Sequence, residues 1–138
     1  AIEKRKQRLF AELPVVSEQL ATLLGAGYSL GSALVRLAER NSGVTGEDLR
    51  IVSDRMQHGL TTTQALQEWA HGADVPELHR LVAVLALSSE TSDLGRLVSE
   101  EAKGIRREAQ RRLVEVIDRR SQQVWVPVTV SVSFATEA

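Results

Sequence analysis

The three histidines, His58, His71 and His79, are the side chains in this 138-residue sequence best suited to metal binding or general acid–base chemistry. His71 and His79 flank the segment GADVPEL, which contributes the carboxylates of Asp74 and Glu77. Their spacing matches no zinc motif. We therefore predict exposed histidines near a helix start and no metal site. A metal-dependent enzyme at His71 and His79 is the least favoured alternative.

The sequence contains no other catalytic pattern. It has no Ser-His-Asp arrangement, nucleophile elbow or phosphate-binding glycine loop, and Gly25-Ala26-Gly27 lacks the downstream lysine that such a loop needs. Cysteine is absent, so disulfides and thiolate metal sites are excluded. We predict a protein that is not an enzyme, with no catalytic residue and no cofactor.

One short pattern recurs at intervals of 32 residues: GYSLGSAL (27–34), GLTTTQAL (59–66) and TSDLGRLV (91–98). Each copy has a residue suited to cap a helix N-terminus at its third position: Ser29, Thr61 and Asp93. Gly27 and Gly59 can end the preceding helix, because glycine adopts left-handed dihedral angles without a steric penalty. Each copy therefore predicts a helix-turn-helix corner.

After each corner, apolar and small residues fall three or four positions apart, which is typical of a helix with one buried face. Helical hairpins of similar length predict an all-α fold. Because only three copies with weak identity are present, we favour a six-helix antiparallel bundle over a stack of repeats.

Local signals predict the limits of several helices. Pro14 suits the first turn of the first helix, and Thr45, followed three positions later by Asp48, suits the start of the third. Residues 81–87 (LVAVLAL) are apolar all round, so we expect that helix at the centre of the core. The last helix should extend from Asp93 to about Gln123, and one end should project from the compact domain.

The final stretch VWVPVTVSVSF alternates apolar and polar residues, which by itself is typical of a strand. A lone strand has no partner and Pro127 interrupts it, so we expect no sheet. We predict three parts: a basic lead (1–12), which the family resemblance described below implies is juxtamembrane, a helical domain (13–123), and the start of a truncated membrane segment or a disordered tail (124–138). Because the start lacks an apolar signal region and no run reaches about 18 apolar residues, we expect the chain as given to be soluble.

The net charge of −1 conceals a segregation of charge along the chain. Residues 1–8 carry a net +3 and residues 103–120 a net +4, whereas residues 9–102 carry 6 basic and 13 acidic side chains. Such segregation indicates either a partner or plain solvated charge. One alternative is a soluble helical adaptor or nucleic-acid-binding module that uses the basic helix 103–120. The sequence pI of about 6.4 and the interspersed Glu108, Glu115 and Asp118 disfavour nucleic acid as a partner.

The three corners resemble those of the type II secretion system F family. The resemblance extends over residues 13–126 and rests on LLGAGYSLGSAL (23–34), on MQHGLT (56–61) with Ala65-Leu66, and on SETSDL (89–94). At the third corner Ser89 precedes Glu90, and Asp93 stands where secretion and type IV pilus members tend to have a glycine. With these departures, the chain resembles the tight-adherence (Tad/Flp) pilus branch of the family more than the secretion and type IV pilus members.

The resemblance implies the cytoplasmic domain of an inner-membrane platform protein for pilus assembly or protein secretion. It implies a six-helix bundle, a cytoplasmic assembly ATPase as partner, other platform and pilin subunits, and a homodimer. Basic chain ends beside a membrane are what the positive-inside rule predicts. The membrane-proximal candidates are Lys4, Arg5, Lys6, Arg8, Arg119 and Arg120. The candidates for ATPase binding are Asp48, Asp54, Asp74, Glu77 and Glu90.

Overall fold

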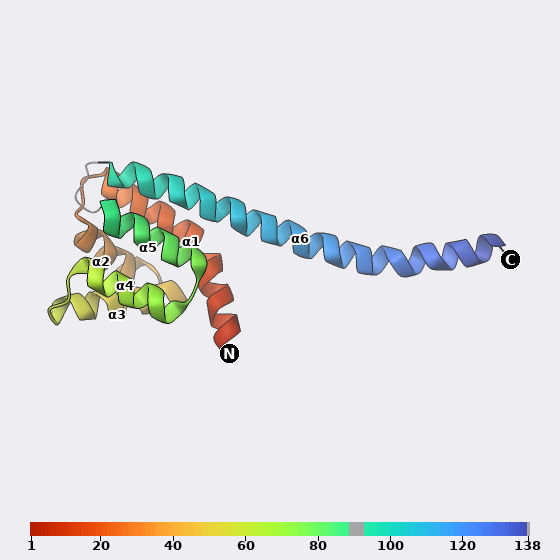
Figure 1. Ribbon diagram of the computed structural model, residues 1–138, viewed down its shortest axis with the longest axis horizontal. Coiled ribbons are helices and arrows are strands. Elements are labelled where there is room, and N and C mark those ends of the chain that lie inside the picture. Colours follow the sequence, from red (N-terminus) through yellow and green to blue (C-terminus); the bar gives the residue numbers. More distant parts are fainter. Residues whose placement is uncertain (89–92, 138) are drawn as a thin grey trace. The chain divides into compact units, whose positions relative to one another are not determined.

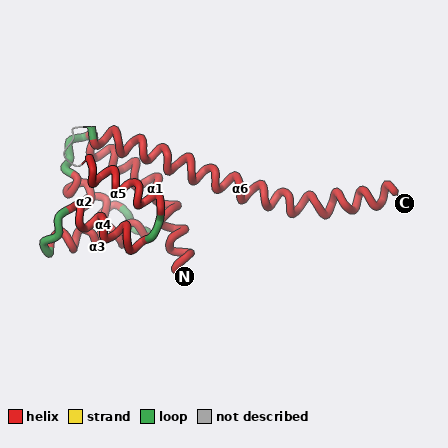
Figure 2. The backbone as a smooth tube through the Cα atoms, viewed as in Figure 1, coloured by secondary structure: helices red, strands yellow, loops and turns green. Residues whose placement is uncertain are grey.

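The computed structural model describes residues 1–88 and 93–137, with side chains for 1–87 and 93–121. The described residues form six α-helices and no strand (Figures 1 and 2). The helices are α1 (Ile2–Gly25), α2 (Leu30–Arg40), α3 (Val44–Gln57), α4 (Thr62–Ala73), α5 (Pro76–Ser88) and α6 (Leu94–Glu137). The prediction of an all-α fold with a long last helix is confirmed.

The chain divides into two compact units, Ala1–Arg106 and Arg107–Ala138, and the boundary lies inside α6. The helix α6 passes the predicted end at Gln123 and continues to Glu137. A helix satisfies its backbone hydrogen bonds within the segment, which a lone strand cannot do. The expectation of no sheet therefore holds for the described residues. Whether 124–138 begins a membrane segment remains a prediction.

Two of the three corners share one hydrogen-bonding pattern. The backbone N–H of Tyr28 donates to the carbonyl of Leu23, and that of Leu60 donates to the carbonyl of Arg55. The glycines just before them, Gly27 and Gly59, have φ of 99° and 106°. Both corners are thus Schellman motifs, in which glycine relieves the strain of a left-handed residue. The third corner includes residues 89–92, which lie outside the described residues.

The predicted caps at these two corners are also confirmed. The Ser29 hydroxyl accepts a hydrogen bond from the Ser32 backbone N–H at 3.2 Å. Thr61 and Gln64 form a reciprocal capping box, with distances of 3.1 and 3.0 Å. Each corner therefore ends one helix and starts the next with local contacts alone.

The first unit has one hydrophobic core to which all six helices contribute. Helix α1 contacts α2, α3 and also α5, which is distant in sequence. In a stack, each repeat would contact only its neighbours. The unit is therefore a bundle, as predicted.

The first helix begins much earlier than predicted. It starts at Ile2, and Pro14 lies inside it rather than in its first turn. Leu9 and Leu13 precede the proline and are almost fully buried, so the apolar face of α1 already begins within the basic lead. The helix changes direction along its length (Figure 1), as expected of a helix with an internal proline.

The fifth helix is not buried on all sides, so that prediction is wrong. Its buried face consists of Leu78, Leu81, Val82 and Leu85, at the spacing of a one-sided helix, whereas Leu87 is 87% exposed. The run LVAVLAL (81–87) thus packs against the core through one face of the helix only. Its apolar composition wrongly suggested that Leu87 would also be buried.

The third helix begins one residue before Thr45, with Gly43 as its N-cap, and the predicted capping role of Thr45 is wrong. The cap comes from α1 instead. The Glu12 carboxylate accepts hydrogen bonds from the backbone N–H groups of Val44 and Thr45 at 3.2 and 2.9 Å. The buried Thr45 hydroxyl donates to the same carboxylate at 2.8 Å. A carboxylate at a helix N-terminus is favourable, because the free N–H groups and the helix dipole both attract negative charge.

Candidate interaction site

The corner where the N-terminal half of α1 meets α3 and α4 contains a buried carboxylate. Asp48 of α3 is 7% exposed. Its Oδ1 lies 2.7 Å from Nη2 of Arg5, and its Oδ2 accepts a hydrogen bond from Nε1 of Trp69 at 2.8 Å. The hydrogen bond to Asp48 raises the pKa of Arg5 above its ordinary value. One carboxylate therefore joins three helices.

A second ion pair joins the same elements. Nζ of Lys6 lies 3.1 Å from Oδ2 of Asp74, the C-cap residue of α4, which has a φ of 54°. Two residues predicted to face a membrane, Arg5 and Lys6, thus bind two residues predicted to face a partner, Asp48 and Asp74. Of the two carboxylates, only that of Asp48 is buried, whereas the Asp74 side chain is 74% exposed.

The remaining candidates differ in exposure. Glu77 of α5 is 2% exposed and lies 3.9 Å from Arg80, so it belongs to the interior. Asp54 is exposed, with its carboxylate 3.6 Å from the imidazole of His58. Glu90 lies outside the described residues. In the basic lead, Lys4 and Arg8 are exposed, and so are Arg119 and Arg120 in the second unit.

A cavity of about 190 Å³ opens beside the buried carboxylate. Its walls come from α1, α3 and α4: Arg5, Asp48, Ile51, Arg55, Glu68, Trp69, Gly72 and Ala73. Two of these residues, Arg55 and Glu68, form an ion pair at 3.2 Å. The sequence reasoning missed this cavity. No local pattern could have revealed it, because its walls come from three helices.

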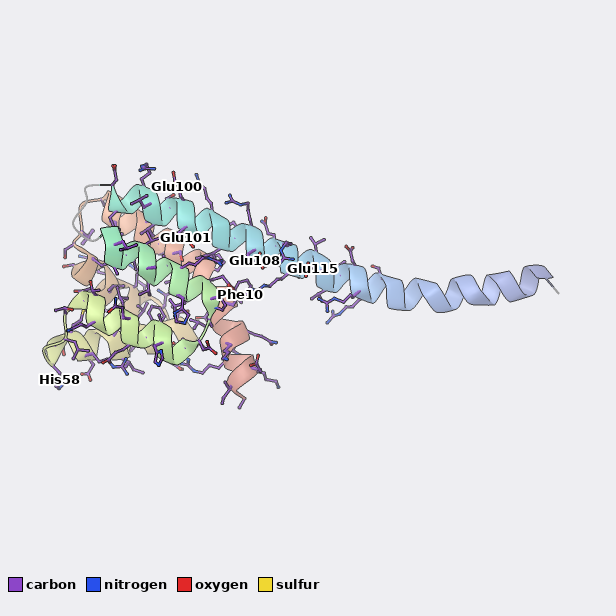
Figure 3. The ribbon with its side chains drawn as sticks, in the orientation of Figure 1. Phe10, His58, Glu100, Glu101, Glu108 and Glu115 are labelled. Atoms are coloured by element: carbon purple, nitrogen blue, oxygen red, sulfur yellow. The ribbon has the colours of Figure 1, made fainter. Side chains whose placement is uncertain are left out.

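The basic part of α6 contains ion pairs within the helix. In the second unit, Nη2 of Arg111 and Nε of Arg112 lie 2.6 and 3.1 Å from Oε1 of Glu108, and Arg111 also pairs with Glu115. Both carboxylates are labelled on α6 in Figure 3. The hydrogen bond from Arg111 lowers the pKa of Glu108 to about 2. The carboxylates of these pairs interrupt the positively charged surface that binding to nucleic acid phosphates would need.

The three histidines are exposed. His58 follows α3 at the second corner, where Figure 3 labels it, and its Nδ1 lies 2.7 Å from the backbone carbonyl oxygen of Asp54. Among the residues that the structure describes, no three His, Asp or Glu side chains come together as metal ligands would. His71 and His79 therefore form no described site with Asp74 and Glu77.

The fold and the site define an all-α bundle of helical hairpins in which ion pairs join helices distant in sequence. The chain belongs to the type II secretion system protein F family, whose description, "Type II secretion system (T2SS), protein F", matches residues 16–136. Members of this family are inner-membrane-associated, non-catalytic platform proteins of secretion and pilus systems. Neither the curated proteins nor the solved structures contain a match to this chain.

Within the described residues, we find no helix whose length and apolar character would suffice to span a bilayer.

Proposed function

We propose that this chain is a non-enzymatic coupling domain of an inner-membrane platform protein, which links a cytoplasmic assembly ATPase to pilin insertion or extraction. The family match carries the proposal, because it extends from residue 16, inside α1, to residue 136, near the end of α6. The departures at Ser89 and Asp93 support assignment to the tight-adherence (Tad/Flp) branch. Pilin and other platform subunits are the expected partners, and the domain itself is expected to dimerise.

The charge pattern supports a position on the cytoplasmic face of the inner membrane. Basic residues beside membrane segments are retained on the cytoplasmic side and attract anionic lipid, at about 1 kcal/mol per residue near the surface. Because Arg5 and Lys6 are engaged with carboxylates, the free charge of the lead is concentrated at Lys4 and Arg8. In the second unit, Arg119 and Arg120 are the exposed basic residues that precede residues 124–138.

Liposome co-sedimentation of the chain tests this position. With vesicles containing anionic lipid, the pair Lys4→Gln and Arg8→Gln should lower the bound fraction, and Arg119→Gln with Arg120→Gln should lower it separately. The matched control is Arg36→Gln with Arg40→Gln, which removes two exposed charges of α2. If the control lowers the bound fraction equally, net charge alone explains the effect. If the parent chain does not bind, the membrane-surface role is contradicted.

ATPase binding is proposed for the exposed acidic side chains, because Asp48 and Glu77 are buried in the bundle. Asp54 and Asp74 are the remaining candidates in the described residues, and Glu47 and Glu68 are exposed acids of α3 and α4 nearby. Substitutions at these sites should reduce co-purification of the ATPase with the full-length protein. We would use Asp54→Lys, Glu68→Lys and Asp74→Asn, since asparagine tolerates the left-handed backbone at position 74.

Retention of the ATPase by all three variants would remove the proposed surface. Binding of duplex DNA with a steep salt dependence would instead favour the nucleic-acid-binding alternative.

A further inference from the structure

The cavity at the α1–α3–α4 corner has walls of two kinds. Ile51, Trp69 and Ala73 supply apolar side chains, and Ile51 as a whole is about half exposed. Arg5 and Arg55 supply two guanidinium groups, each paired with a carboxylate of the same cavity, Asp48 or Glu68. The carboxylates hold the two guanidinium groups in place, and an aromatic ring can stack on the planar face of a guanidinium group.

The size of the cavity fits one side chain. An apolar protein cavity of about 150 Å³ accommodates benzene. The volume here is about 190 Å³. Tryptophan and arginine are also the residues in which binding energy concentrates at protein interfaces, particularly where a partner side chain fills a pocket.

Gly72 of α4 lines the cavity and has open space beside its backbone. A Cβ atom built at this glycine meets no other atom within 4 Å, and its backbone is not in the left-handed region. A glycine inside a helix costs about 0.5–1 kcal/mol relative to alanine. Neither packing nor backbone conformation requires Gly72, which leaves room for a group that enters the cavity.

We propose that this cavity binds a phenylalanine or tyrosine side chain of a partner polypeptide, with the ring packed on Trp69 and Ile51 beside the guanidinium groups of Arg5 and Arg55. This inference goes beyond the proposed function, because it requires neither the membrane nor the ATPase. Failure of the liposome or co-purification tests would leave it unchanged.

The test is a titration of the isotopically labelled 138-residue chain followed by amide and indole NMR signals. The probe is the capped pentapeptide acetyl-Gly-Gly-Phe-Gly-Gly-amide, and the control peptide has alanine at its centre. We expect saturable shifts at Ile51, Gly72, Ala73 and the Trp69 indole, with a Kd on the order of 1 mM for a single anchoring side chain. The alanine peptide should bind at least tenfold more weakly.

Two variants assign the shifts to the cavity. Gly72→Leu should block the cavity and weaken binding at least tenfold, and Ile51→Asn should weaken it several-fold by removing exposed apolar surface. The matched control is Gly25→Leu, at a helical glycine in α1 that is likewise clear of other atoms. Thermal unfolding of each variant checks that the bundle is intact.

Three outcomes would overturn the proposal: absence of saturable shifts, equal binding of the two peptides, or a folded Gly72→Leu chain that binds like the parent. Tighter binding of free phenol than of the phenylalanine peptide would overturn the assignment to a polypeptide. Saturable binding that requires both the aromatic ring and an open Gly72 supports it.

Discussion

Ion pairs at the α1–α3–α4 corner and ion pairs along the second unit of α6 use the same chemical groups in different ways. At the corner, Arg5 and Lys6 bind carboxylates that lie 43 and 68 residues away in sequence. In the second unit, Arg111 and Arg112 bind a carboxylate three or four residues away on an exposed helix. The corner contacts hold different helices together, whereas those of α6 support one helix. Sequence separation and burial, rather than the number of pairs, decide which of them stabilise the fold.

The largest effect is expected from Asp48→Ala. It leaves the buried Trp69 N–H without its acceptor, at a cost of about 1–3 kcal/mol, and removes the partner of a half-exposed Arg5, which adds less than about 1 kcal/mol. We expect the free energy of unfolding to fall by about 2–3 kcal/mol in urea denaturation. Asp54→Ala, at an exposed carboxylate of the same helix, should change it by less than about 0.5 kcal/mol. Equal values for the two variants would show that the buried pair does not hold the corner together.

A smaller loss is expected from Glu12→Ala, which removes the carboxylate cap of α3. Substitution of a capping side chain costs about 0.5–2 kcal/mol, and the buried Thr45 hydroxyl also loses its acceptor. We expect a loss of about 1–2 kcal/mol, with hydrogen exchange of the Val44 and Thr45 amides accelerated most. The control Glu18→Ala alters the same helix at an exposed ion pair with Arg106. Unchanged exchange at Val44 and Thr45 would contradict the capping role.

The smallest effect concerns pH and the second unit. The folded-state pKa of Glu108 is about 2, below its ordinary value of 4.5. Its ion pairs therefore stabilise the helix fully above pH 4.5, and that contribution is lost as the pH falls toward 2. The ¹³C shift of the Glu108 carboxyl should titrate near pH 2, with a parallel loss of helical Cα shifts around residue 108. Glu108→Gln should remove this dependence, and titration near 4.5 would contradict it.

The contrast between the two regions also explains which features the sequence could predict. The Gly27 and Gly59 corners and the Ser29 and Thr61 caps were predictable, because each depends on residues within about five positions. The cap of α3 was not, since its carboxylate comes from Glu12, 33 residues before Thr45. Thr45 carried a local capping signal, but its hydroxyl became a donor to that carboxylate.

The same distinction between local and distant residues applies to the candidate site. The sequence identified Asp48, Asp54, Asp74 and Glu77 as candidate acidic residues. It did not show which of them the fold buries. Burial of Asp48 depends on Trp69 and Arg5, which converge only in three dimensions. The cavity beside it was unpredictable for the same reason. The place of Pro14 inside α1 and the exposed side of residues 81–87 also depend on how the neighbouring helices pack, so the sequence alone did not predict them.

The position of the Glu12 cap has a practical consequence for the design of shorter fragments. The family match begins at residue 16, which makes that residue a natural choice for a cloning boundary. A fragment that starts there would lack the buried Leu9 and Leu13, the partner of Asp48 and the cap of α3. Such a fragment should express poorly or aggregate, although every residue of α2 to α5 would be present. The boundary of the folding unit therefore lies upstream of the boundary of the recognisable family pattern.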